Sequence, residues 1–79
     1  MIPLYVFVDG DVLGLALLAD PGQTVDAFIA QIQRAARVRV RPREGMSLRF
    51  KDRPLPGGAC VGALGLAPLD RVDLVKEVS

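Results

Sequence analysis

The sequence contains no histidine and no tryptophan, and it has only one cysteine and two glutamates. Without histidine, the commonest general base of nucleophilic catalysis and the commonest nitrogen ligand of metals are both missing. The single cysteine, Cys60, has no second cysteine with which to form a disulfide, whereas small secreted domains usually carry several. We therefore interpret Cys60 as a small apolar residue, and we expect no catalytic, metal or cofactor site in this chain.

Aromatic side chains and long apolar runs are also scarce. Aromatics make up 5% of the 79 residues and hydrophobic residues 51%, so the core must be mainly aliphatic. The longest mostly apolar run, residues 12–19, lies between two aspartates and is far too short to span a bilayer. Residues 1–3 lack the basic start of a signal peptide. We expect a single domain, residues 1–79, located in the cytoplasm and without a membrane partner.

Charge is segregated along the chain, although the net charge is only +1. Residues 1–33 carry four aspartates and no base, whereas residues 34–53 carry eight bases against two acids. Such an uneven field can orient a partner, and it can equally belong to a solvated face.

The N-terminal part predicts a β-hairpin. Residues 2–9 alternate with period two, and Tyr5 and Phe7 fall on the face opposite to the aliphatic residues. Residues 9–11, Asp-Gly-Asp, predict the turn, and residues 12–19 predict the returning strand. The two aspartates do not continue into the spacing of a calcium loop, so a turn is the better interpretation.

A helix is predicted after the hairpin. Thr24 has the chemistry of an N-cap, and Asp26 suits the positive end of the helix dipole. Pro42 disfavours helical geometry in the residue before it, so the helix cannot run past residue 41. One apolar stripe recurs at helical spacing, formed by Val25, Phe28, Ile29, Ile32 and Ala36.

The remainder of the chain predicts two more strands. Residues 46–51 alternate as a half-buried strand, and residues 71–78 form the last strand. Between them, Leu55 is expected to insert into the core and residues 61–66 to form a short helical turn. The predicted fold is α+β, with a small mixed sheet packed on one amphipathic helix and with the first and last strands parallel at its centre.

This order of elements resembles ubiquitin, most clearly in residues 48–55, 64–66 and 70–75. The resemblance implies a ubiquitin-like β-grasp fold. It does not imply conjugation to other proteins, because the sequence ends in residues 77–79, Glu-Val-Ser, instead of Gly-Gly. Arg49 also stands where ubiquitin places an exposed isoleucine of its recognition patch. We expect a protein that is not a conjugating modifier.

A closer resemblance covers roughly residues 2–78. Residues 2–5, 24–26, 38–45 and 65–68 are similar to the B (gamma) subunit of toluene monooxygenases, whereas the turn at 51–60 departs from it. These bacterial multicomponent di-iron enzymes hydroxylate aromatics or epoxidise alkenes. The resemblance implies a small non-catalytic accessory subunit that docks on the large di-iron hydroxylase subunit of a hetero-oligomer. The iron, electron transfer and substrate pocket would then belong to other chains.

The alternative is a free-standing interaction protein. Residues 42–45, Pro-Arg-Glu-Gly, are also similar to a small ubiquitin-like protein encoded in some bacterial type VII secretion loci. Residues 2–5 and the hairpin rich in aspartate fit that family less well, so we rank it second.

Two features predict a partner interface. The basic run, residues 34–43, has two interpretations, either a docking surface for an acidic partner or a strand edge with its arginines outward and with Val38 and Val40 inward. Nucleic acid is disfavoured as the partner, because no aromatic side chains interleave these arginines. The aromatic face of the first strand is either an exposed patch or a face shielded by the hairpin or by the basic run. The predicted interface residues are Tyr5, Phe7, Arg37, Arg39, Arg41, Arg43 and Arg49.

Overall fold

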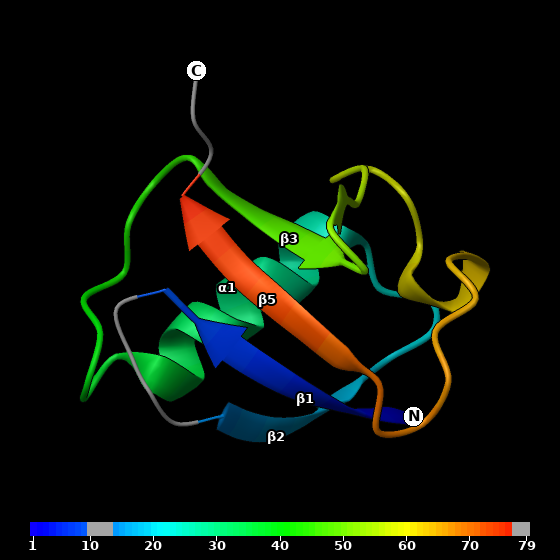
Figure 1. Ribbon diagram of the computed structural model, residues 1–79, viewed down its shortest axis with the longest axis horizontal. Helices are drawn as coiled ribbons and strands as arrows, with labels where there is room; N and C mark the ends of the chain where they lie inside the picture. Colours follow the sequence, from blue (N-terminus) through cyan, green and yellow to red (C-terminus); the bar gives the residue numbers. More distant parts are fainter. Residues whose placement is uncertain (10–13, 77–79) are drawn as a thin grey trace.

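The computed structural model, which describes residues 1–9 and 14–76, shows a five-stranded sheet with one α-helix packed against one of its faces (Figure 1). A short 3₁₀ turn lies between the fourth and fifth strands. The elements are β1 (Ile2–Val8), β2 (Gly14–Ala19), α1 (Val25–Ala36), β3 (Met46–Phe50), β4 (Arg53–Pro54), η1 (Val61–Ala63) and β5 (Arg71–Lys76).

The strand order is β2-β1-β5-β3-β4, so the last strand of the chain lies at the centre of the sheet. β1 and β5 pair in parallel, and all other neighbours pair antiparallel. The predicted α+β fold, with its mixed sheet and its parallel first and last strands, is confirmed. The two-residue strand β4 was not predicted. It pairs with β3 through a tight turn in which Lys51 and Asp52 both have positive φ, at 51° and 62°.

The helix begins where its cap was predicted. The Thr24 hydroxyl accepts a hydrogen bond from the Ala27 N–H at 3.1 Å, which satisfies one of the free amides of the first turn. The helix ends at Ala36, well before Pro42. Its predicted apolar stripe is confirmed, since four members are buried and Ile29 is partly buried against the core.

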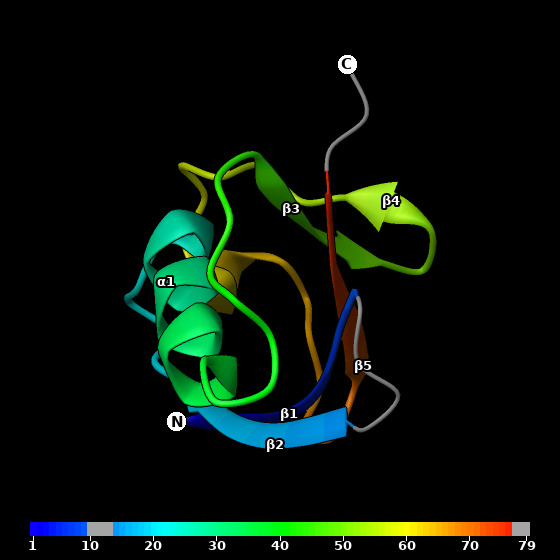
Figure 2. The ribbon, with the colours of Figure 1, turned by 90° about the vertical axis from the view of Figure 1, so that its left-hand side faces the viewer.

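The core lies between α1 and one face of the sheet (Figure 2). Leu55 packs against this core from the segment after β4, as predicted, and Leu64 packs against it from the end of η1. All strands except the short β4 contribute buried side chains, namely Leu4, Val6, Val8, Ala19, Leu48, Val72 and Leu74. Among residues 1–9 and 14–76, no helix lies over the sheet face turned away from α1, so this part of the chain covers the sheet on one side only (Figure 2).

The interpretation of the basic run as a strand edge is wrong. Residues 37–40 form turns at the end of α1, where the N–H groups of Arg39 and Val40 donate to the Ala36 carbonyl at 2.9 and 2.8 Å. Val38 was expected to point inward and is instead 88% exposed, whereas Val40 packs against the core. Closure of the helix end therefore overrides the local Arg-Val alternation. The predicted turn at 9–11 lies mostly outside the described residues, as do the start of the 12–19 strand and the end of the 71–78 strand.

The sidedness of the sheet gives a stability prediction. Leu74 and Val75 are neighbours on β5, and Leu74 is fully buried beneath α1 whereas Val75 is on the other face. We expect Leu74→Ala to lower the free energy of unfolding by about 2–5 kcal/mol, because it leaves a cavity in the core. The matched variant Val75→Ala is expected to cost about 1 kcal/mol or less. Urea unfolding followed by circular dichroism measures both, and equal losses would contradict the one-sided packing.

Candidate functional site

The outer face, defined as the sheet face turned away from α1, carries one of the two predicted groups of interface residues. Tyr5 is 45% exposed there, and Leu18 of the neighbouring strand β2 is 52% exposed. The strand register places Phe7, Asp73 and Arg49 opposite one another across β1, β5 and β3. The β1–β2 half of the outer face is thus largely apolar, and the β5–β3 half is charged.

Phe7 is half-buried on the outer face because Arg71 covers it. The Arg71 guanidinium lies 4.1 Å from the centre of the Phe7 ring and pairs with the Asp73 carboxylate at 3.1 Å. The ring also lies against Gly14, where an added Cβ would come within 2.9 Å of it, so only glycine fits without a shift. The cation–π contact and the ion pair together fix Arg71 over the aromatic ring. The apolar surface that remains exposed is therefore centred on Tyr5 and Leu18.

Arg49 is engaged within the chain. Its guanidinium donates a hydrogen bond to the Asp52 carbonyl, in the tight turn that connects β3 to β4. The Arg49 side chain is half-buried, so part of its donor capacity is used to hold this turn.

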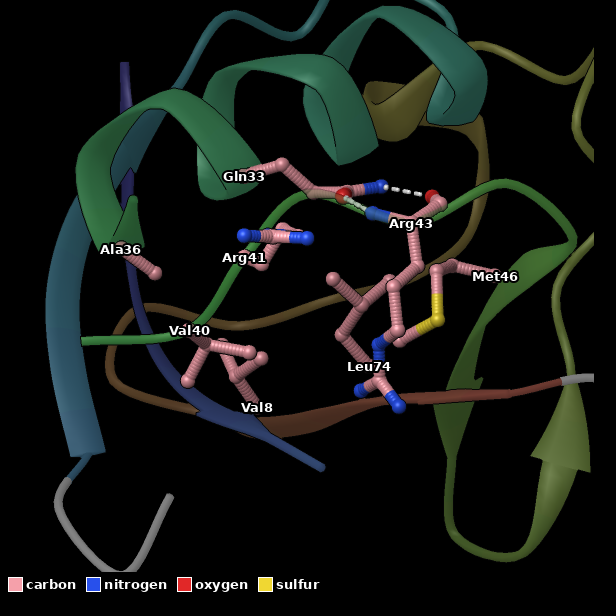
Figure 3. A pocket seen from close by; sticks show the side chains of 8 residues that line it. All are labelled: Val8, Gln33, Ala36, Val40, Arg41, Arg43, Met46 and Leu74. Atoms are coloured by element: carbon pink, nitrogen blue, oxygen red, sulfur yellow. Dashed lines mark hydrogen bonds between the residues drawn. The ribbon is translucent and has the colours of Figure 1, made fainter. Parts of the chain in front are cut away.

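The second predicted group lies on the basic loop, which we define as residues 37–43. This loop follows α1 and runs along the side of the molecule between the helix and the sheet (Figure 2). Gln33 of α1 fixes its far end, because the Arg43 N–H donates to Gln33 Oε1 at 2.6 Å and Gln33 Nε2 donates to the Arg43 carbonyl at 3.0 Å (Figure 3). The loop backbone is thus held at Arg43 by a side chain that satisfies both of its polar groups.

Arg43 ties the basic loop to the sheet. Its guanidinium donates to the Asp9 carbonyl at 2.9 Å and lies 3.7 Å from the Asp9 carboxylate, just after the end of β1. Beneath the loop, Val40 faces Val8 and Leu74 around a cavity of about 10 Å³, which is space for roughly one water molecule (Figure 3). This cavity is too small for a substrate or cofactor.

The structure therefore divides the predicted interface set between two surfaces. Tyr5, Phe7 and Arg49 lie on the outer face, and the arginines at 37, 39 and 41 lie on the basic loop. Arg43 serves as an internal tie, and which residues bind a partner stays a prediction. Two contributors were missed, Gln33 and Arg71. Period two along the last strand could have found Arg71, because it puts that residue on the face opposite to Val72 and Leu74, but no sequence signal pairs Gln33 with Arg43.

Within residues 1–9 and 14–76, no three histidine, cysteine, aspartate or glutamate side chains are placed to hold a metal ion. Cys60 is exposed just before η1, so it is not part of the core. No described helix is long and apolar enough to cross a membrane. The surfaces with distinctive chemistry are the outer face and the basic loop, and both are suited to contact another macromolecule.

Comparison with solved structures defines the class of fold. The chain is similar to a ubiquitin from Caldiarchaeum subterraneum, with a TM-score of 0.78 and 22% sequence identity over 99% of this chain and 95% of that one. At that identity the likeness concerns the fold alone, and it confirms the predicted ubiquitin-like β-grasp. No protein-family model matches the sequence, and no curated protein sequence matches it.

A second likeness is stronger. The chain is similar to a chain of the toluene 4-monooxygenase HD complex, solved with the inhibitor 4-bromobenzoate. The TM-score is 0.87 and the identity 25%, over 96% of this chain and 98% of that one. The predicted resemblance to the toluene monooxygenase system is confirmed at the level of structure. Because both chains are covered almost completely, the likeness extends over the whole domain.

The Gln33 contact predicts how the basic loop is held. We expect Gln33→Ala to lower the free energy of unfolding by about 1–3 kcal/mol, because it leaves the N–H and carbonyl of Arg43 without their partner. The neighbouring variant Arg34→Ala, at an exposed position, is expected to change it by about 0.5 kcal/mol. Hydrogen exchange measured by NMR should show faster exchange of the Arg43 amide in Gln33→Ala. An unchanged exchange rate would mean that Gln33 does not hold the loop in solution.

Proposed function

We propose that this chain is the small, non-catalytic accessory (gamma or B) subunit of the hydroxylase in a toluene-monooxygenase-like di-iron monooxygenase. The observation that carries the proposal is the match of the whole chain to a whole chain of the toluene 4-monooxygenase HD complex, at a TM-score of 0.87. In this proposal the chain acts in the cytoplasm and docks on the large catalytic subunit of a hetero-oligomer that oxidises aromatic hydrocarbons or alkenes.

The residues of this chain do not fit a di-iron centre. Such centres take a glutamate from each of two helices and a Glu-x-x-His pair from each of two others. The sequence has no histidine, and the described residues form a single α-helix, whose only acidic residue is Asp26 in its first turn. The proposal therefore assigns the iron, the electron transfer and the substrate pocket to other subunits, and assigns no cofactor to this chain.

A rigid binding module suits an accessory role of this kind. The core is filled by fully buried aliphatic side chains and Phe28, and no buried side-chain N or O atom in the described residues lacks a hydrogen-bond partner. A domain held in one conformation loses little further entropy on docking, so more of the contact energy contributes to affinity.

The proposal is tested by purification from the native host. A tagged copy of the chain at its own locus is expected to retain a large helical subunit with paired Glu-x-x-His motifs, at a constant ratio through successive columns. The same tag on an unrelated protein is the control. Deletion of the gene is expected to reduce hydroxylation of toluene by whole cells.

Two results would overturn the proposal. One is purification of the chain as a lone monomer, together with hydroxylase activity that is unchanged by the deletion. The other is co-purification with a membrane ATPase and small helical export proteins, which would support the alternative of a ubiquitin-like protein of type VII secretion.

A further inference from the structure

The tip of the basic loop combines positive charge with an exposed apolar side chain. Val38 is 88% exposed, more than any other large hydrophobic residue in the described part of the chain. Arginines flank it at positions 37 and 39, a third follows at 41, and residues 34–43 contain five arginines and no acid. A β-branched apolar residue at the centre of a basic surface contributes nothing to the core of the isolated chain.

Stability of the helix accounts for only part of this composition. Arg34 and Arg37, at the end of α1, interact favourably with the negative end of the helix dipole. Arg41 lies four residues beyond the C-cap, where that effect has faded, and Val38 carries no charge at all. An explanation based on the folded monomer therefore leaves Arg41 and Val38 unaccounted for.

The loop is also fixed before any partner binds. Gln33 holds the backbone of Arg43, the Arg43 side chain reaches Asp9, and Val40 is anchored against the core. Between these anchors, Arg37, Val38 and Arg41 are all exposed. Fixing a loop in advance reduces the entropy lost on binding, which favours recognition by these side chains.

A shallow groove lies beside the loop. It has a volume of about 340 Å³ and runs along α1. Ala30 and Pro42 supply its apolar surface, Arg34 supplies positive charge and Glu44 one carboxylate, whereas the Arg43 guanidinium is already paired with Asp9. A small apolar side chain of a partner would fit the groove against Ala30 and Pro42, and carboxylates of the same segment would complement the exposed arginines of the loop.

We propose that the basic loop is the docking element of this chain and that it binds an acidic segment of the large partner subunit. Arg37 and Arg41 pair with carboxylates of that segment, and Val38 inserts into an apolar socket between them. The inference rests on the proposed function, because it takes the large subunit as the partner. It goes further by naming the surface and the chemistry that the surface recognises.

The outer face is less suited to the same task. Its two arginines are engaged within the chain, Arg49 with the Asp52 carbonyl and Arg71 with Phe7 and Asp73. By contrast, no ion pair of Arg37 or Arg41 is present among residues 1–9 and 14–76. Charges that folding has not used are available for a partner without the loss of an internal contact.

Nucleic acid is a poorer match to the loop than an acidic protein. Surfaces that bind single strands place aromatic rings between their basic residues, and residues 34–45 contain no aromatic residue. The apolar tip at Val38 would also face the phosphate backbone without a complementary group. An acidic polypeptide satisfies both the arginines and the valine.

The experiment compares two double variants in the native host, each tagged at the chromosomal locus. Arg37→Glu with Arg41→Glu reverses two charges on the basic loop. Arg53→Glu with Lys76→Glu reverses two exposed charges on β4 and β5, so that the change in net charge is the same. Thermal unfolding of each purified chain checks that it still folds, and Arg37→Gln with Arg41→Gln is the milder form if the first does not.

We expect the loop variant to retain about tenfold less large subunit than the wild type at roughly 150 mM salt, and the control variant to retain nearly as much as the wild type. Val38→Asp is expected to weaken retention as well. Raising the salt concentration should weaken the wild-type complex and leave the loop variant little changed, because the pairing charges are already lost.

Other outcomes separate this inference from the proposed function. If the loop variant keeps the large subunit and Leu18→Glu on the outer face loses it, the docking surface is wrong and the accessory role stands. If no variant and no wild-type chain retains a large subunit, the proposed function fails first. Two further results would overturn the inference: dimerisation of the purified chain that the loop variant abolishes, or binding of a 20-nucleotide single strand at low salt that it abolishes.

Discussion

The whole structure depends on the burial of one helical stripe against one face of the sheet. Phe28 and Ile32 of α1 are fully buried, and they face a sheet side lined with valine and leucine. Each apolar side chain of this size contributes about 1.5–3 kcal/mol when it leaves water. With four aromatic residues in the chain and a single helix in its described part, no second source of burial of comparable size is available.

Burial of only one sheet face determines where the charged side chains of this fold lie. Because α1 covers one face only, the outer face is in contact with solvent. Arg71 shields the apolar Phe7 ring there by lying over it and pairing with Asp73. The side of the molecule between α1 and the sheet must also be closed. The basic loop performs this task with Val40 inward and with Gln33 and Asp9 as its anchors. Its arginines are therefore placed at a fixed position relative to the core.

The fold was predictable because its main signals are periodic. Period two marked β1, β3 and β5, helical period marked α1, and Thr24 marked the helix start, since each depends on which residues must face a single core. The same rule failed at residues 37–41. Arg-Val alternation there resembles a strand, but the backbone amides of Arg39 and Val40 are used to close the helix at Ala36.

The candidate site was only partly predictable, because its contacts join residues far apart in the chain. Composition and charge pointed to the arginines and to the aromatic pair. They gave no sign that Gln33 bonds to the backbone of Arg43, or that Arg43 reaches Asp9 across the end of β1. Such contacts decide whether an arginine is already bonded within the chain or is exposed to a partner. A sequence pattern can therefore identify the arginines, but it cannot show which of them a partner could bind.

The likeness to two different kinds of protein shows why it matters which surface residues are exposed to a partner. The same arrangement of one helix and five strands is similar to an archaeal ubiquitin and to a chain of a monooxygenase complex, so the fold by itself does not determine the partner. The distinction must come from the surface. At Arg49, where ubiquitin presents an apolar residue, this chain has a guanidinium that is bonded to its own turn. An interaction surface centred on the outer face would include arginines that are already engaged within the chain, whereas one centred on the basic loop would use Arg37 and Arg41, which folding leaves exposed.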